Sequence, residues 1–406
     1  MSLFRSRFVT ACQQLLALGA VLAVLTPAAS LISLDVVRQP PAGATVSGTG
    51  SEVGVLSAYA QVARSAATLP ATAVDPVVRE VSLTGTVAAR AVPGGGQRLL
   101  SRPEVVTGDG MVGVTWASGA EVAEEDLSIA ARTLTDGEWS GWSTLEYHDE
   151  HGPDPDSREG RQARPGTEPL YVGDVDRVQV RVVDTAGAAP ADLRLAVIDP
   201  GPPSRTVSQR AALDTAETTS AAGPAARGGV TPEPQIFSRA QWGADESMRD
   251  KGSLRYYEVH AGFVHHTVNA NDYSRDDVPG ILRSIYAYHT KSRGWSDVGY
   301  NFLVDRFGRI WEGRYGGVDR PVVGAHTLGY NDYAFAMSAI GNFEQVRPSE
   351  AMVGAYGALF AWKLSLHGVD ASSMRQQVGS RTFPAVNGHR DAGSTACPGK
   401  HLYDRL

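Results

Sequence analysis

Cysteine, positive charge and long apolar runs are all scarce in this sequence of 406 residues. Its two cysteines are Cys12 and Cys397, and the first lies in a segment that we expect to be removed. The one remaining cysteine excludes an intramolecular disulfide, which leaves Cys397 as a metal ligand, a reactive nucleophile or a buried side chain. The 37 basic and 44 acidic residues give a net charge of −7, which argues against nucleic-acid binding through bulk electrostatics.

The one long apolar run stands near the amino terminus, where residues 1–30 have the pattern of a secretory signal peptide. Arg5 and Arg7 precede an apolar run of eleven residues, 15–25, and small residues follow at 28–30. An uncleaved membrane anchor is the alternative, but the run is shorter than the roughly 20 residues that a membrane span needs. We therefore expect a secreted, monomeric mature protein without a membrane span.

Changes in composition divide the following part of the chain. Residues 31–75 are rich in small residues with weak periodicity and predict a loosely ordered lead-in, whereas residues 201–233 have the composition of a linker. Between them, residues 76–200 contain short apolar runs separated by turn residues, which is typical of an antiparallel β-sandwich. Trp139 and Trp142 follow one such turn and either bind the face of a sugar or pack against the sheet, which is the commoner role.

The last part, residues 234–406, predicts an α/β domain in which helices flank a mixed sheet. Strands are expected within 259–268 and 299–314, and helices over 277–292 and 349–367, each beginning with a residue able to cap it. This part contains 19 basic residues, 17 acidic residues and eight of the ten histidines. Titratable chemistry is therefore concentrated there.

A candidate metal site follows from residue types and spacing in this part. His389 and Cys397 are eight residues apart in a loop that can bend both side chains toward one point. His265 and His266 are adjacent on a predicted strand, so only one of them faces a given side. Two imidazoles and a thiolate form an open catalytic zinc site that lowers the pKa of a water. The residues alone leave a second interpretation open, with a buried Cys397 and no metal.

Six segments of this part resemble a known family, and they occur in that family's order. The family is that of the peptidoglycan recognition proteins and type 2 N-acetylmuramoyl-L-alanine amidases. The matching segments are SRAQWGA (238–244), FVHHT (263–267), WSDVGYNFLVDRFGRIWEGR (295–314), GAHTLGYND (324–332), AIGNF (339–343) and GHRDAGSTACPG (388–399).

The resemblance implies roles for individual residues. It implies that zinc is bound by His265, His389 and Cys397, a set of ligands that is typical of the catalytic members. Tyr300 matches the family's catalytic tyrosine, whose phenol can donate a hydrogen bond to the developing oxyanion. Thr395 occupies a position where some phage members have lysine, and we expect it to assist there.

The resemblance also implies a groove for the peptide of the substrate. His326, Trp295 and Arg314 correspond to residues that line this groove. Arg314 either pairs with a carboxylate of the stem peptide or is solvated at the end of a strand. The loop 315–323 is longer than the family pattern, so the sequence does not distinguish diaminopimelate from lysine in the substrate.

The function implied is that of a zinc amidase associated with the cell wall. It would hydrolyse the amide between N-acetylmuramic acid and L-alanine, with the glycan strand and stem peptide of peptidoglycan as its partner and no nucleic acid. A non-catalytic peptidoglycan receptor is one alternative, and the intact ligand set argues against it. A cysteine hydrolase with Cys397 as nucleophile and His389 as base is another. Pro398 disfavours it, because proline removes a backbone N–H where such enzymes commonly bind the oxyanion.

Overall fold

The computed structural model describes residues 59–61, 65–83, 90–91, 97–119, 122, 126–148, 150–185, 189–212 and 230–406. The predicted signal peptide, most of the predicted lead-in and the centre of the predicted linker lie outside these residues. Within the described ranges, no helix combines the length and the apolar character that crossing a membrane requires.

The β-rich region contains two antiparallel sheets and a separate two-stranded ribbon. The first sheet has the order β10–β6–β12–β2, and the second has the order β3–β4–β11–β7–β8, with β5 beside β11 and β9 beside β7. The strands of the first sheet are β2 (Val77–Ser82), β6 (Asp109–Thr115), β10 (Leu170–Asp174) and β12 (Arg194–Asp199). Those of the second are β3 (Arg90–Ala91), β4 (Gln97–Leu100), β5 (Glu104–Val105), β7 (Leu127–Thr135), β8 (Glu138–Trp139), β9 (Ser143–Leu145) and β11 (Arg177–Asp184). In the ribbon, β1 (Ala67–Pro70) pairs with β13 (Thr206–Gln209), so part of the predicted linker is a strand.

The two sheets enclose an apolar core built from alternate residues. Val112 and Val114 of β6 belong to the same buried cluster as Val180 and Val182 of β11. This confirms that the region is β-rich with antiparallel sheets, as the turn spacing predicted. On the second sheet, the guanidinium of Arg132 lies 4.4 Å from the ring of Trp139 and 4.8 Å from that of Trp142. Both tryptophans therefore pack against an arginine of the sheet.

The carboxyl-terminal region is built on one mixed sheet with the order β14–β17–β16–β18–β15–β21. Only β16 and β17 are antiparallel, as a hairpin of this kind requires, and the other neighbours are parallel. The strands are β14 (Ile236–Phe237), β15 (Ala261–His266), β16 (Phe302–Val304), β17 (Ile310–Glu312), β18 (Ala334–Ala339) and β21 (Val386–Gly388). A short hairpin, β19 (Gln376–Val378) with β20 (Arg381–Phe383), lies apart from this sheet.

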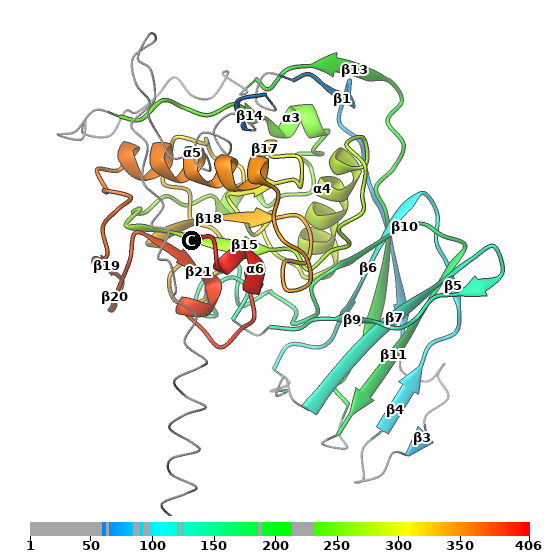
Figure 1. Ribbon diagram of the computed structural model, residues 1–406. Coiled ribbons are helices and arrows are strands. Elements are labelled where there is room, and N and C mark those ends of the chain that lie inside the picture. Colours follow the sequence, from blue (N-terminus) through cyan, green and yellow to red (C-terminus); the bar gives the residue numbers. More distant parts are fainter. Residues whose placement is uncertain are drawn as a thin grey trace, which may run out of the picture. The chain divides into compact units, whose positions relative to one another are not determined.

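Two helices pack on opposite faces of this sheet (Figure 1). On β15, Phe263 belongs to the buried cluster that contains α4 (Val278–Ala287), and its neighbour Val264 belongs to the cluster that contains α5 (Glu350–Leu366). Because neighbouring strand residues point to opposite faces, the two clusters mark the two faces. The shorter helical elements are α3 (Arg239–Trp242), η2 (Lys251–Ser253), η3 (Tyr288–Ser292), η4 (His389–Asp391) and α6 (Lys400–Tyr403).

The two predicted long helices differ in how closely they match their predicted ends. Ser349 caps α5 as predicted, since its hydroxyl accepts a hydrogen bond from Met352 N at 3.1 Å. Asp277 does not cap α4, because its carboxylate binds the backbone N–H and hydroxyl of Ser274 at 2.7 Å. The last predicted turn of that helix, η3, winds as a π-helix.

Helix α4 also packs against the β-rich region. Met111 of β6 and Ile198 of β12 share a buried cluster with Ile285 of α4. The hydroxyl of Tyr288 donates to Thr167 O at 2.9 Å. The first sheet is therefore covered on one face by the second sheet and on the other by α4.

Candidate metal centre

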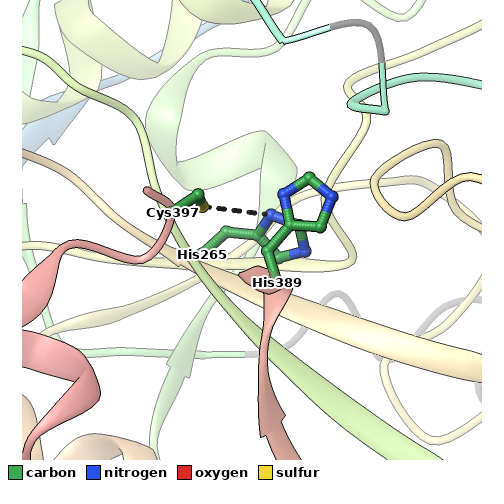
Figure 2. A group of neighbouring side chains, drawn as sticks. All are labelled: His265, His389 and Cys397. Carbon is green, nitrogen blue, oxygen red and sulfur yellow. Dashed lines mark hydrogen bonds between the residues drawn. The ribbon is translucent and has the colours of Figure 1, made fainter. Parts of the chain in front are cut away.

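Three side chains converge at the end of β15. His265 is the fifth residue of this strand, His389 directly follows the neighbouring strand β21, and Cys397 lies in the loop before α6. Their ligand atoms all lie within 4.8 Å of one another, and Figure 2 shows the three side chains turned toward one point. The Cys397 Sγ is 3.6 Å from His265 Nδ1. All three residues are buried, with at most 4% of their surface exposed.

Thr327 fixes the orientation of the His265 ring. Its Oγ1 is 3.1 Å from His265 Nε2, which leaves Nδ1 on the side of the Cys397 sulfur. The same hydroxyl is 3.0 Å from Nδ1 of His326. Asn331 holds the turn in place, because its Oδ1 accepts the backbone N–H groups of both His326 and Thr327. A hydrogen bond on the far nitrogen of a ligand histidine is the usual way to set its ring orientation.

His266 lies on the other side of the strand, as its adjacency to His265 requires. Its Nδ1 accepts a hydrogen bond from Phe343 N at 3.2 Å, and its ring is buried. Its backbone N–H nevertheless points at the site and donates to Cys397 Sγ at 3.5 Å. Strand β15 thus contributes to the centre both a ring and a backbone donor.

Burial controls the charge of these groups. Burial, reinforced by the neighbouring histidines, lowers the pKa values of His265 and His389 well below the ordinary range. Burial also raises the pKa of the Cys397 thiol above its usual value. His389 Nε2 is buried and has no hydrogen-bond partner among the residues described. Neutral imidazoles, an orphaned ring nitrogen and a buried sulfur are a donor set that fits a zinc ion, whose charge would stabilise the thiolate.

Tyr300 and Thr395 lie next to these three residues. The ring of Tyr300 is 5.5 Å from that of His265, and burial raises the pKa of its phenol well above the ordinary value. The phenol therefore keeps its proton and can donate it in a hydrogen bond. Thr395 Oγ1 accepts a hydrogen bond from Cys397 N at 3.1 Å, which leaves its own hydroxyl proton available to another acceptor.

The residues predicted to contact substrate lie near the centre but are covered. His326 is fully buried, with its ring 5.6 Å from that of His265. Trp295 is 3% exposed. Arg314 is not solvated, because both of its terminal nitrogens contact the Glu159 carboxylate, at 2.7 and 3.0 Å.

Three further residues lie at or around this centre and were not predicted from the sequence. Thr327 directly follows His326, which was predicted to contact substrate, whereas His151 and Glu168 belong to the β-rich region. His151 stacks on Tyr300 with ring centroids 5.0 Å apart, and its Nδ1 contacts the Glu168 carboxylate. Nothing in the local sequence around 150–168 marks these residues as part of a site, since Tyr300 lies 149 positions beyond His151 along the chain.

Both regions of the chain match known families. Residues 255–400 match the family described as N-acetylmuramoyl-L-alanine amidase, and residues 66–207 match one described as Rv3811 N-terminal galactose-binding domain-like. Peptidoglycan-recognition protein SC2 of Drosophila melanogaster is 34% identical over 173 residues, which cover 42% of this chain and 84% of that protein. Human N-acetylmuramoyl-L-alanine amidase is 33% identical over 177 residues, or 43% of this chain and 28% of that protein. The solved structure of Drosophila PGRP-LB is 29% identical, covers 41% of this chain and 89% of that one, and aligns with a TM-score of 0.35.

Proposed function

The chain belongs to the peptidoglycan recognition protein family, and on that premise we propose that it is a zinc-dependent N-acetylmuramoyl-L-alanine amidase. The scissile bond would be the amide between N-acetylmuramic acid and L-alanine. The protein would be secreted and act on the cell wall as a monomer. Glycan and free stem peptide would be its products.

The convergence of His265, His389 and Cys397 is the observation that supports this proposal most directly. Their donor atoms gather within 4.8 Å at the buried end of a strand. Burying a thiol and two imidazoles together costs free energy unless a cation stabilises them. A protein that only bound peptidoglycan would have no need of this arrangement.

The remaining residues have roles that follow from their positions. A zinc ion bound by the three residues would polarise the scissile carbonyl and lower the pKa of a water. Thr327 holds the ring of His265 so that Nδ1 lies on the side of the Cys397 sulfur and would be the nitrogen that binds the ion. Tyr300, protonated because it is buried, is placed to donate a hydrogen bond to the oxyanion as it develops. Thr395 holds the backbone of Cys397 and can donate its own proton to the same oxygen.

The proposal is tested by following stem-peptide release from a soluble muropeptide. The mature full-length chain is used at a concentration equal to that of the substrate, so that even slow turnover is detected. Mass spectrometry should find a free peptide beginning with L-alanine, and a chelator should abolish its release until zinc is restored. A zinc-loaded protein that binds the muropeptide and releases nothing would instead be a receptor.

A cysteine hydrolase is the second candidate, and the same assay separates it. Release that persists after chelation and stops on alkylation of Cys397 would favour it. The structure offers little support for this chemistry, because burial raises the pKa of the Cys397 thiol and makes the nucleophilic thiolate harder to form.

Removal of the Tyr300 hydroxyl tests its catalytic role. Tyr300→Phe keeps the ring, so we expect zinc content near that of the wild type and a kcat lower by about 10²-fold, the scale of a lost oxyanion donor. Zinc is measured by elemental analysis and kcat on the soluble muropeptide. Tyr286→Phe is the matched control, because its hydroxyl binds Asp245 O away from the centre. Unchanged turnover in Tyr300→Phe would make this tyrosine a packing residue.

A further inference from the structure

Residues 150–168 of the β-rich region, here termed the closing segment, lie beside the metal centre. The backbone of the segment is bound to the turn that positions His326 and Thr327. Leu328 N donates to Glu150 O at 3.1 Å, and the Asn331 side chain donates to Gly152 O at 3.1 Å. The segment thus occupies the Leu328 N–H and the Asn331 amide at this turn.

Glu159 of the closing segment binds the predicted anchor for a substrate carboxylate. Its two oxygens accept from both terminal nitrogens of Arg314, at 2.7 and 3.0 Å, and one also accepts from Ser296 N at 2.9 Å. The Arg314 side chain is 7% exposed and that of Glu159 is 11% exposed, so the pair is shielded from water. A carboxylate of this chain therefore occupies the place expected for a carboxylate of the stem peptide.

His151 of the same segment faces the metal centre. It is 4% exposed, and its Nε2 is buried without a hydrogen-bond partner among the described residues. Its ring centroid lies 5.9 Å from that of His265 and 6.3 Å from that of His389. Two imidazoles on one tetrahedral zinc ion have ring centroids about 5 Å apart, so the His151 ring lies about 1 Å farther from each ligand histidine than a bound ring would.

Glu168 supports the ring of His151 from behind. Its carboxylate contacts Nδ1 and both side chains are nearly inaccessible, at 3% and 6% exposure. A carboxylate on the far nitrogen, with the near nitrogen unpartnered, is the usual arrangement of a histidine that binds a metal.

We propose that His151 is a fourth ligand of the metal centre, supplied by the β-rich region, and that the closing segment thereby holds the enzyme in a resting form. A fourth protein ligand converts an open catalytic zinc site into a closed one. Substrate could then reach the metal only after the closing segment has moved away from it. Binding of His151 to the metal requires only that His265, His389 and Cys397 form a metal site. The resting form of an enzyme, in contrast, rests on the function proposed above.

The test uses the full-length chain with cobalt(II) in place of zinc, because the visible spectrum of cobalt reports its ligands. Azide is the probe for an open coordination position. We expect azide to leave the wild-type spectrum unchanged and to shift the spectrum of His151→Ala. The apparent affinity of the variant for azide should be at least about tenfold tighter than that of the wild type, because a site that is closed more than nine-tenths of the time binds at least about tenfold more weakly. His148→Ala is the matched control, because this histidine of the same loop contacts Glu146 and should behave like the wild type.

A measurement on the wild type alone covers the case in which His151→Ala does not fold. X-ray absorption at the zinc edge counts the imidazoles on the metal. Three imidazoles and one sulfur support the assignment, and two imidazoles overturn it. Azide binding of equal strength to wild type and variant, or binding to neither, would also overturn it.

Hydrolysis of the soluble muropeptide separates this inference from the proposed function. If both hold, His151→Ala should release stem peptide at least about tenfold faster than the wild type. A variant that gains azide binding but shows no hydrolysis would leave the fourth ligand established and contradict the amidase function alone.

Discussion

Thr327 decides which nitrogen of His265 faces the metal centre, because its hydroxyl binds the opposite one. Thr327→Val keeps the shape of the side chain and removes this bond. We expect zinc affinity to fall by about 10–100-fold, the effect of losing a partner that orients a ligand. Competition with a chromogenic chelator measures the affinity, and Thr382→Val on exposed strand β20 serves as the control. Equal affinities in the two variants would mean that packing alone holds the ring.

The pKa of Glu312 leads to a prediction for how the stability of the fold changes with pH. Burial raises its pKa from 4.5 to about 7, against the opposing charge and N–H donor of Arg239. Between these values the folded state binds a proton that the unfolded state has lost, so the contribution of Glu312 to stability is complete below pH 4.5 and is lost as the pH rises through 7. The shift corresponds to a loss on the order of 3 kcal/mol.

Glu312→Gln should therefore flatten the decline in stability between pH 4.5 and 7. The glutamine amide keeps an oxygen that accepts the backbone N–H of Arg239. The guanidinium of Arg239 still pairs with Asp297 and Glu246. The free energy of unfolding in denaturant at pH 5 and pH 8 measures the effect. Glu138→Gln on exposed strand β8 should retain the wild-type decline, and the same decline in Glu312→Gln would show that the Glu312 carboxyl is not its source.

Motifs were sufficient to identify the metal-binding candidates but not the residues around them. His265, His389 and Cys397 stand in segments that resemble a family, and their convergence could be anticipated. His151 could not be, because its relation to Tyr300 depends on a contact across 149 positions of the chain. Residues whose role arises only from such distant contacts have no local pattern.

At the scale of secondary-structure elements, the amino-terminal cap of α5 provides a prediction. Ser349 accepts from Met352 N and donates to Arg306 O at 2.7 Å, so its hydroxyl joins the helix to the β16–β17 turn. Ser349→Ala should lower the free energy of unfolding by about 1–2 kcal/mol, as expected for the loss of a cap. Chemical denaturation measures the change, and Ser208→Ala on exposed β13 should stay within about 0.5 kcal/mol of the wild type. A similar small effect at Ser349 would mean that water replaces the cap.

Local sequence patterns predicted the spans of the secondary-structure elements better than they predicted which elements lie side by side. The span of α5 follows from a cap, an apolar period and a terminal glycine, all of which are local. The π-helical end of α4 could not be predicted, since Tyr288 there bonds to backbone oxygens of the β-rich region. The place of β15 between β18 and β21 was equally hidden, because parallel neighbours come from distant segments.

At the scale of the molecule, the continuous helical segment of α4 and η3 packs against the first sheet, and Gly113 tests this contact. A Cβ at this position would lie 2.5 Å from the ring of Tyr288, whereas one at Gly141 would meet nothing within 4 Å. Gly113→Ala should destabilise the protein by about 1–3 kcal/mol through overpacking, and Gly141→Ala should have little effect. Thermal unfolding measures both, and equal melting temperatures would mean that this junction adapts without cost.

Composition predicted two regions joined by a linker, and it could not predict how they meet. A sheet with one solvated face would show alternating polar residues, whereas the burial of β6 is nearly continuous from Gly110 to Thr115. Sequence periodicity shows that a strand is buried on both faces but not what covers the second face. The glycine at 113 indicates a close approach only once its partner ring is known.

The fit between Gly113 and Tyr288 has a consequence for how the two regions evolve. A gene encoding the metal-binding region cannot exchange its β-rich partner for an unrelated one without exposing apolar surface on α4 or meeting a side chain where a glycine is required. Recombination at the segment between the two regions would thus produce misfitting chimaeras. The two regions are expected to be inherited together and to accumulate compensating substitutions across their shared core.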